Sequence, residues 1–249
     1  RFSTENILVA TGSWPWVPDV PGIEHAVTSN EMFHLETLPK RAAVVGGGYI
    51  AVEFAGILHG LGVETTLIYR GPLFLRGFDT DVRAFVADEL RKKGIALRFE
   101  TDVREIEKRE DGSLRLHCAD ESSHGDDSDV AGESCHIDVQ GLGLEAVGVE
   151  LGEGGAIVVD EHFRTSVPSI HALGDVIDRA QLTPVAISEA MAFVKTHFGG
   201  QPTAVDYDRI PSAVFCQPNI GTVGPTEEQA RERYGRIAVY ESVFRPMKH

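Results

Sequence analysis

The chain has 249 residues, 42% of them hydrophobic and 24% charged, a composition typical of globular proteins that disfavours a disordered or fibrous class. Its formal net charge of -15 disfavours nonspecific binding to nucleic acid or to an anionic membrane, because both require a positive field. No run approaches the roughly 18 apolar residues of a membrane helix. The three cysteines, Cys118, Cys135 and Cys216, fit neither a disulfide framework nor a CxxC metal site. We therefore expect a cytoplasmic protein with reduced thiols.

The N-terminal part predicts a short strand followed by a loop. Residues 6–10 have the apolar pattern of a buried strand, which ends at Thr11 and Gly12. Three prolines then punctuate residues 13–23. Since proline donates no backbone hydrogen bond, this stretch predicts a connection that leaves one domain, with a boundary near residue 38.

The next part of the chain alternates between strand and helix. Strands are predicted at 42–45, 64–69 and 95–99, and helices at 49–61 and 81–93. Such alternation produces a doubly wound parallel sheet, so the predicted fold class is α/β. Residues 103–108 and 114–119 flank an Asp-Gly turn and predict an antiparallel ribbon after this core.

The second half predicts more scattered elements. Residues 119–135 are polar and predict a solvated loop; an acidic metal site is disfavoured there because the spacing matches no calcium loop. Strands are predicted at 157–159, 170–173, 213–216 and 237–244, a helix at about 184–198, and a capped helix start at 226–230.

The turn from Gly46 to Ala51 carries the clearest chemical signal. It has the GxGxxA form, directly follows a strand and opens an amphipathic helix. Gly46 allows the tight turn, Gly48 lets the backbone approach a pyrophosphate, and Ala51 permits close packing of helix on strand. The helix N-terminus offers unpaired N–H groups to the diphosphate. We predict dinucleotide binding; the alternative is a purely structural glycine turn.

The end of the second strand indicates which dinucleotide is bound. A site that prefers NAD has an Asp or Glu there, which binds the ribose hydroxyls. In this chain the strand ends in Tyr69 and Arg70, and Arg76 follows shortly afterwards. Two guanidinium groups can clamp a 2'-phosphate, so the sequence favours NADPH. The alternative is a pair of exposed surface arginines.

Several other residues have two interpretations each. Tyr49 either packs or covers a nicotinamide pocket, and Glu53 is either a dipole-favourable acid or the partner of a charged group near a flavin. Gly174 and Asp175 follow a strand, where a carboxylate suits a phosphate or sugar-alcohol contact; a turn cap is the alternative. His171 is interpreted as a packed strand residue rather than a ligand.

Segments across nearly the whole chain fit one family. They are 10–12 (Ala-Thr-Gly), 46–53, Arg70 with Arg76, 172–176, 182–186, 215–224 and 244–249. Together they resemble the pyridine nucleotide-disulfide oxidoreductases, and most closely the glutathione reductase branch. The resemblance implies that NADPH reduces FAD, FAD reduces a cysteine pair, and the thiolates reduce glutathione disulfide.

The resemblance also implies roles for individual residues. It places Gly46, Gly48, Tyr49, Ile50 and Glu53 on the nicotinamide side and Arg70 and Arg76 on the 2'-phosphate. It gives Asp175 to the ribityl and phosphate region of FAD and puts Thr183 near the flavin ring, and Gly12 and Gly174 complete the cofactor-binding set. No catalytic residue and no metal ligand is assigned within the chain.

The expected domains follow the same family. Residues 1–37 end an FAD-binding domain, 38–139 form the NADPH-binding domain, 140–205 return to the FAD-binding domain, and 206–249 begin the dimerisation domain of a homodimer. The family's FAD glycine motif, redox cysteine pair and C-terminal His-Pro are missing from the sequence. So is a second Ala-Thr-Gly, expected before Gly141, where Val139 runs straight into Gln140.

We therefore expect an internal portion of a larger enzyme. The other hypothesis is a truncated module that binds NADPH without reducing disulfides. Relatives of dihydrolipoyl dehydrogenase or mercuric reductase are further alternatives, and the former should carry an acid near position 69.

Overall fold

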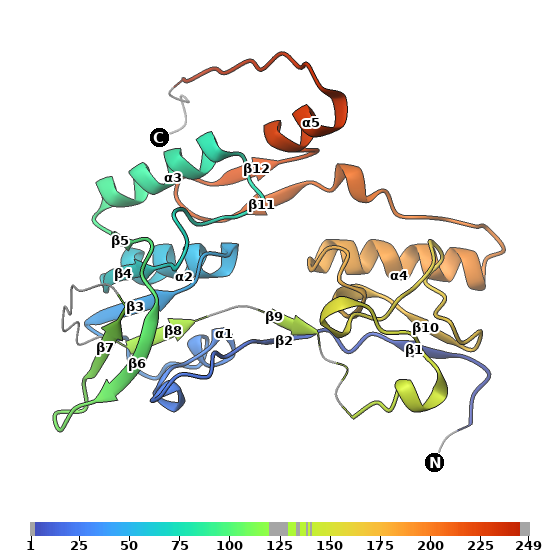
Figure 1. Cartoon of the computed structure of the whole chain (residues 1–249), viewed down its shortest axis with the longest axis horizontal. Coiled ribbons are helices and arrows are strands. Elements are labelled where there is room, and N and C mark those ends of the chain that lie inside the picture. The colour runs from blue at the N-terminus through green and yellow to red at the C-terminus, as the bar shows by residue number, and fades with distance from the viewer. Residues whose placement is uncertain (1–2, 120–128, 133–134, 138, 140, 245–249) are drawn as a thin grey trace.

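The computed structural model describes residues 3–119, 129–132, 135–137, 139 and 141–244. The helices are α1 (Ser29–Met32), α2 (Tyr49–Gly60), α3 (Thr80–Lys93), α4 (Thr183–His197) and α5 (Glu227–Tyr234). The strands are β1 (Ile7–Val9), β2 (Ser13–Pro15), β3 (Arg41–Val45), β4 (Glu64–Ile68), β5 (Ala96–Arg98), β6 (Val103–Lys108), β7 (Leu114–Cys118), β8 (Asp129–Gly132), β9 (Cys135–Ile137), β10 (Ile170–Ala172), β11 (Ser212–Val214) and β12 (Ile220–Thr222). Figure 1 shows two lobes, one built around β3 and the other around β1, β10 and α4, with the β2–β9 ribbon between them.

The first lobe is organised by a four-stranded parallel sheet with the order β5-β4-β3-β8. The chain starts this sheet at β3, builds outward to β4 and β5, and then crosses back to add β8 on the other side of β3. The strand order therefore reverses at the carboxyl end of β3, which is where ligands bind in open α/β sheets. The predicted α/β class with a parallel sheet is confirmed.

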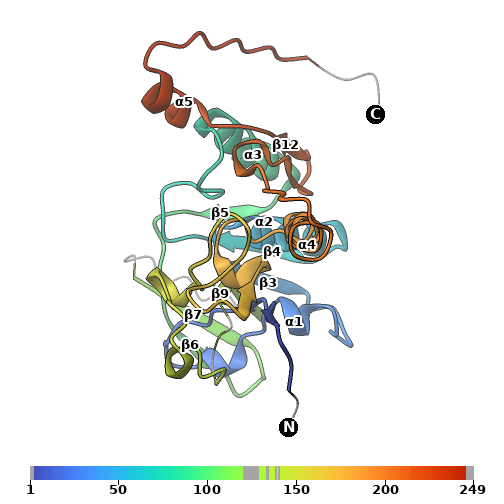
Figure 2. The ribbon, with the colours of Figure 1, turned by 90° about the vertical axis from the view of Figure 1, so that its right-hand side faces the viewer.

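Alternation along β3 and β4 explains why both faces of the sheet are covered. Ala42, Val44 and Leu67 belong to the core that contains α2 and α3, whereas Ala43 and Ile68 belong to the core under the β6–β7 hairpin. This is the period of two expected for a strand that is buried on both sides. Figures 1 and 2 show the two helices and the hairpin on opposite sides of the sheet.

The second lobe has its own core. β1 and β10 pair in parallel, with Ile7 opposite Ile170, and α4 packs beside them. Phe163 is fully buried there, and His171 is only 4% exposed with its ring 5.2 Å from that of Phe193. The interpretation of His171 as a packed strand residue is therefore confirmed.

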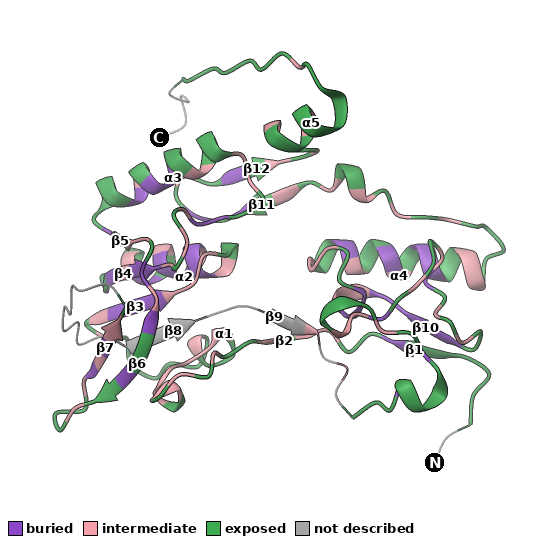
Figure 3. Ribbon diagram, viewed as in Figure 1, coloured by how far each residue is buried: buried purple, intermediate pink, exposed green. Residues whose placement is uncertain are grey.

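The C-terminal segment attaches to the first lobe. Val214, Cys216 and Ile220, from β12 and the region of β11, join the same core as α2 and α3. Burial raises the pKa of the Cys216 thiol, as expected for an unreactive structural cysteine. No residue of α5 is buried, and Figure 3 shows this helix and the segment after it as largely exposed.

Two loop predictions are wrong. Within the predicted loop 119–135, residues 129–132 form β8, which pairs in parallel with β3, and Cys135 starts β9; residues 120–128 and 133–134 lie outside the described part. Within the predicted connection 13–23, β2 pairs with β9 and ends at Pro15. In both places a distant strand offers hydrogen-bond partners, which local composition does not reveal.

Two strand predictions are also wrong. At 157–159 only Ile157 forms an isolated bridge, to Leu151, across a turn that contains three glycines. Residues 237–244 form no strand, and Tyr240 is 93% exposed. An apolar, β-prone stretch gains ladder hydrogen bonds only where a neighbouring strand is present. The remaining predicted strands and helices are confirmed, with shifts of a few residues at their ends. The first strand is present but not buried as predicted, because Ile7 is 47% and Leu8 44% exposed.

Candidate functional site

The glycine turn joins the end of β3 to the start of α2. The Gly46 N–H donates to the Ile68 carbonyl at 2.9 Å, which ties the turn to the neighbouring strand β4. Gly48 is the N-cap of α2, and no side chain caps the helix there. The positive end of the α2 dipole therefore lies at the glycine turn, where it favours an anion.

Gly48 is not required by packing within the protein. A Cβ built on Gly48 would meet no heavy atom within 4 Å, and its backbone is extended, with φ −82° and ψ 174°. A Cβ would therefore fit the described chain at this position. The absence of a side chain leaves an open approach to the helix N-terminus, as a bound diphosphate needs.

At Gly47, by contrast, packing within the protein leaves no room for a side chain. A Cβ on Gly47 would lie 2.3 Å from the ring of Tyr69, and one on Gly71 would lie 2.7 Å from the same ring. The ring at the end of β4 therefore sits between two glycines. Tyr69 occupies the place where an NAD site has its acid, and its ring is wedged against the phosphate turn.

The two predicted phosphate ligands follow Tyr69. Arg70 and Arg76 are both exposed, in the loop that runs from β4 to α3. The backbone N–H of Leu75, beside Arg76, donates to the Gly47 carbonyl at 2.6 Å. This bond ties the arginine loop to the glycine turn. The structure thus brings together the two motifs that the sequence predicted separately.

A second group of predicted residues lies in the other lobe. Gly174 and Asp175 follow β10, and the Ser13 hydroxyl donates to Asp175 Oδ2 at 2.7 Å. The Gly174 N–H donates to Glu189 Oε2 at 2.6 Å, and the Tyr207 hydroxyl donates to Glu189 Oε1 at 2.6 Å. Glu189 is only 1% exposed, so a buried carboxylate supports the turn that carries Asp175.

Two further predicted residues, Gly12 and Thr183, flank this group. Gly12 has φ 78°, a left-handed conformation that favours glycine, and it links β1 to the strand that carries Ser13. Thr183 is the exposed first residue of α4. An Asp carboxylate at a strand end, beside a helix N-terminus, suits a ligand that carries hydroxyl and phosphate groups.

Comparisons with known proteins decide the family. The model of the pyridine nucleotide-disulphide oxidoreductases matches residues 1–190, and the model of that family's dimerisation domain matches residues 210–249. The chain belongs to the pyridine nucleotide-disulfide oxidoreductase family. This family binds FAD and NAD(P), which the glycine turn and the Asp175 group fit.

The most similar relatives include trypanothione and glutathione reductases. A trypanothione reductase of Leishmania donovani is 48% identical, with 100% of this chain and 51% of the relative covered. A glutathione reductase of Burkholderia cepacia is 46% identical (99% and 55%), and the chloroplastic/mitochondrial glutathione reductase of Pisum sativum is 47% identical (99% and 45%). The predicted resemblance to glutathione reductases is confirmed, and trypanothione reductases match as well. The chain spans about half the length of these relatives.

Solved structures of flavoprotein disulfide reductases have a similar fold. The Cu(II) complex of the HOCl-induced flavoprotein disulfide reductase RclA from Escherichia coli matches with a TM-score of 0.85 at 30% identity, and 92% of this chain and 53% of that chain are covered. No helix in the described residues is long and apolar enough to cross a membrane.

Glu53 has a structural contact that neither sequence interpretation included. Its Oε1 accepts the Phe215 N–H at 2.8 Å, so the side chain links α2 to the segment after β11. Tyr49, the first residue of α2, is 38% exposed, and Ile50 is half-buried. The nicotinamide-side roles of these three family residues remain predictions.

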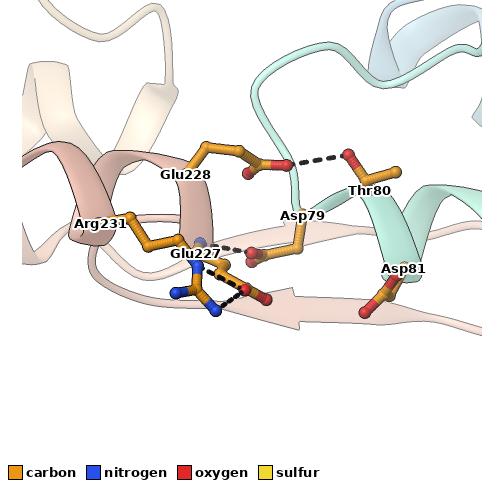
Figure 4. A pocket seen from close by; sticks show the side chains of 6 residues that line it. All are labelled: Asp79, Thr80, Asp81, Glu227, Glu228 and Arg231. Carbon is orange, nitrogen blue, oxygen red and sulfur yellow. Dashed lines mark hydrogen bonds and ion pairs between the residues drawn. The ribbon is translucent and has the colours of Figure 1, made fainter. Parts of the chain in front are cut away.

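An acidic groove lies where α5 meets α3 (Figure 4). It is lined by Asp79, Thr80, Asp81, Glu227, Glu228 and Arg231. Asp79 accepts the Glu227 N–H at 2.6 Å, and the Thr80 hydroxyl donates to Glu228 at 3.0 Å. Among the described residues no cluster of three or more potential ligands suits a metal ion. The two hydrogen bonds join the N-termini of α3 and α5.

Sequence reasoning missed the residues that support the site. Glu189 carried a readable signal, because Val185, Ala192 and Phe193 place it on the buried face of α4. A glutamate there must find hydrogen-bond donors. The contact of Ser13 with Asp175 joins residues that are 162 positions apart, and no local pattern predicts it.

Proposed function

We propose that this chain forms the NADPH-binding part of a flavoprotein disulfide reductase that acts on glutathione disulfide. The observation that carries the proposal is the turn at Gly48, open to a diphosphate and joined to a loop with Arg70 and Arg76. Tyr69 replaces the acid that would bind an unphosphorylated ribose.

The assignment of residues to cofactors follows from the two lobes. Gly46, Gly48, Tyr49, Ile50 and Glu53 would hold the diphosphate and nicotinamide side of NADPH. The FAD set would be Gly12, Gly174, Asp175 and Thr183, with the ribityl and phosphate groups at Asp175. Bound FAD supplies a flavin that accepts hydride from NADPH and passes electrons to a cysteine pair.

Glutathione disulfide is the proposed substrate because two of the relatives described above are glutathione reductases. A trypanothione reductase is a second candidate, supported by the Leishmania relative at 48% identity. A module that only binds NADPH remains the non-catalytic alternative. The redox cysteine pair is missing from this sequence, so a longer reading frame that encodes such a pair would favour an enzyme over the module. NADPH oxidation by the protein that carries the pair, with FAD and each disulfide in turn, then separates the two reductases.

The assembly and the domain limits are part of the same proposal. Residues 1–37 and 140–205 would belong to an FAD-binding domain, 38–139 to the NADPH-binding domain and 206–249 to a dimerisation domain of a homodimer. The family's dimerisation model, matched at 210–249, supports the last assignment. A cytoplasmic location is proposed from composition, although the pea relative is chloroplastic/mitochondrial by name.

Fluorescence titration with NADPH and, separately, NADH tests the nucleotide assignment. We expect selective NADPH binding, and we expect Arg70→Ala/Arg76→Ala to weaken it by about 3 kcal/mol, roughly 100-fold, because charge-assisted bonds to the 2'-phosphate are lost. NADH binding should hardly change. The control Arg104→Ala/Arg236→Ala removes two exposed arginines elsewhere. Equal loss of both nucleotides in the Arg70/Arg76 variant contradicts the assignment.

A further inference from the structure

The loop from β4 to α3 is held at its middle by a side chain of α3. The Arg83 Nε donates to the Phe74 carbonyl at 2.7 Å, and Nη2 donates to the Leu73 carbonyl at 2.6 Å. Hydrogen bonds from an ionised donor are roughly twice as strong as neutral ones, and the guanidinium fork fixes their direction. The held carbonyls lie between Arg70 and Arg76 in the chain.

The held segment does not adopt a relaxed conformation. Leu75 has φ 56°, which is left-handed for a residue with a branched side chain, although it is 1% exposed. Such a conformation costs on the order of 1 kcal/mol and persists only where the surroundings enforce it. The neighbouring Phe74 is fully buried and meets the Phe99 ring edge-on at 5.5 Å. Packing of Phe74 and Leu75 and the Arg83 hydrogen bonds to Leu73 and Phe74 therefore hold the same short segment in place.

The helix itself does not favour an arginine at position 83. This residue follows the first turn of α3, where the positive end of the helix dipole disfavours a cation. The Leu73 and Phe74 carbonyls, which accept hydrogen bonds from the guanidinium, compensate for this. The pKa of Glu228 in α5 is lowered by hydrogen bonds from the Glu228 backbone amide and from the Thr80 hydroxyl. The positive charge of Arg83 lowers this pKa further. The guanidinium is thus held on the arginine loop.

We propose that Arg83 is a positioning residue that sets the preference of this site for NADPH over NADH. By holding the Leu73 and Phe74 carbonyls, it fixes the spacing of Arg70 and Arg76, the two groups that would meet the 2'-phosphate. The inference rests on the proposed function. NADH has no 2'-phosphate, so its affinity should not depend on that spacing.

The experiment compares Arg83→Met and Arg83→Lys with the wild-type chain, by fluorescence titration with both nucleotides. Arg83→Met should weaken NADPH binding about tenfold, as expected when charge-assisted support is lost, and change NADH binding less than about threefold. The NADPH affinity of Arg83→Lys should lie between those of Arg83→Met and the wild type, because the ammonium keeps the charge but cannot bind both carbonyls as the guanidinium does. Arg104→Met, which removes an exposed arginine paired with Asp102 at 3.4 Å, is the matched control and should bind like the wild type.

A second readout separates positioning from general destabilisation. Hydrogen exchange of the Leu75 amide, which donates to Gly47, should accelerate in Arg83→Met, whereas exchange in β10 of the other lobe should not. Retention of the full NADPH preference by a folded Arg83→Met overturns the inference. If Arg83→Met does not fold, Arg83→Lys decides: a reduced preference supports the inference and an undiminished one overturns it. Equal binding of both nucleotides by the wild-type chain instead overturns the proposed function.

Discussion

The two predicted cofactor regions are built by different means. In the first lobe, Gly46 to Arg76 lie in one continuous segment, and the turn and loop are joined by main-chain bonds such as Leu75 N–H to the Gly47 carbonyl. In the second lobe, the Asp175 turn is completed by Ser13, 162 positions away, and by Glu189 of α4. One site is local in sequence, and the other is assembled by the tertiary fold.

This difference predicts which substitutions should damage each region. The first depends on atoms that are absent, because Gly47 and Gly71 make room for one aromatic ring and Gly48 leaves a helix end open. The second depends on a buried acceptor, because Glu189 receives two donors at 2.6 Å. Added atoms should therefore damage the first region, and loss of a carboxylate should damage the second.

The largest effect is expected from Glu189→Ala. The change leaves the Gly174 N–H and the Tyr207 hydroxyl without their acceptor, and each part-buried donor costs about 1–3 kcal/mol if it stays unpaired. We expect the free energy of unfolding to fall by about 3 kcal/mol in urea denaturation, with faster hydrogen exchange at Gly174. Glu161→Ala is the control, since its side chain is 77% exposed. If the two variants lose the same stability, Glu189 does not support the turn.

A smaller effect is expected in the first lobe, from two neighbouring glycines. Gly47→Ala puts a methyl group 2.3 Å from the Tyr69 ring and should cost about 2 kcal/mol of stability. Gly48→Ala meets no protein atom, so it should cost only about 0.5 kcal/mol while weakening NADPH and NADH alike, because both carry the diphosphate. Thermal denaturation and titration of each variant measure the two effects.

Double variants with Tyr69→Leu test whether Gly47 and Gly48 have different roles. Gly47→Ala combined with Tyr69→Leu should recover part of the lost stability, since the clash is with the ring. Gly48→Ala should recover none of its nucleotide affinity from Tyr69→Leu. Recovery in both combinations, or in neither, would show that the two glycines do not have the distinct roles that the structure gives them.

The comparison also explains what the sequence could predict. The elements from β3 to β5 are set by local patterns: apolar strands, helical periods in α2 and α3, and a glycine turn at residues 46–48. Arg70 and Arg76 follow a strand end whose position is part of the same pattern. The alternation of strands and helices from β3 to β5 and the place of the dinucleotide turn were therefore predictable.

The remaining features depend on partners that are distant in the chain. β8 lies in a polar stretch and is a strand only because β3 has an open edge, and β2 exists because β9 returns to it. Residues 237–244 have strand-like composition but form no ladder in the described structure. The support of the arginine loop by Arg83 required coordinates, because one charged residue on a helix surface gives no pattern.

The last expected effect depends on pH. Burial, followed by the hydrogen bond to Glu189, raises the pKa of Tyr207 from 10.0 to about 12, against an opposing effect of Arg179. The neutral phenol is thus favoured in the folded state. Its contribution to stability is complete below pH 10 and is lost as the pH rises through about 12.

Tyr207→Phe removes this titration together with the bond to Glu189. Near neutral pH the variant should be less stable than the wild type by about 1 kcal/mol, the net worth of a typical hydrogen bond. Above pH 10 the difference should narrow, because only the wild type has a phenol to ionise at this position. Urea denaturation across the alkaline range measures it, with Tyr240→Phe, whose residue is 93% exposed, as the control. A difference that stays constant up to pH 12 would mean that Tyr207 ionises equally easily in the folded and unfolded chain.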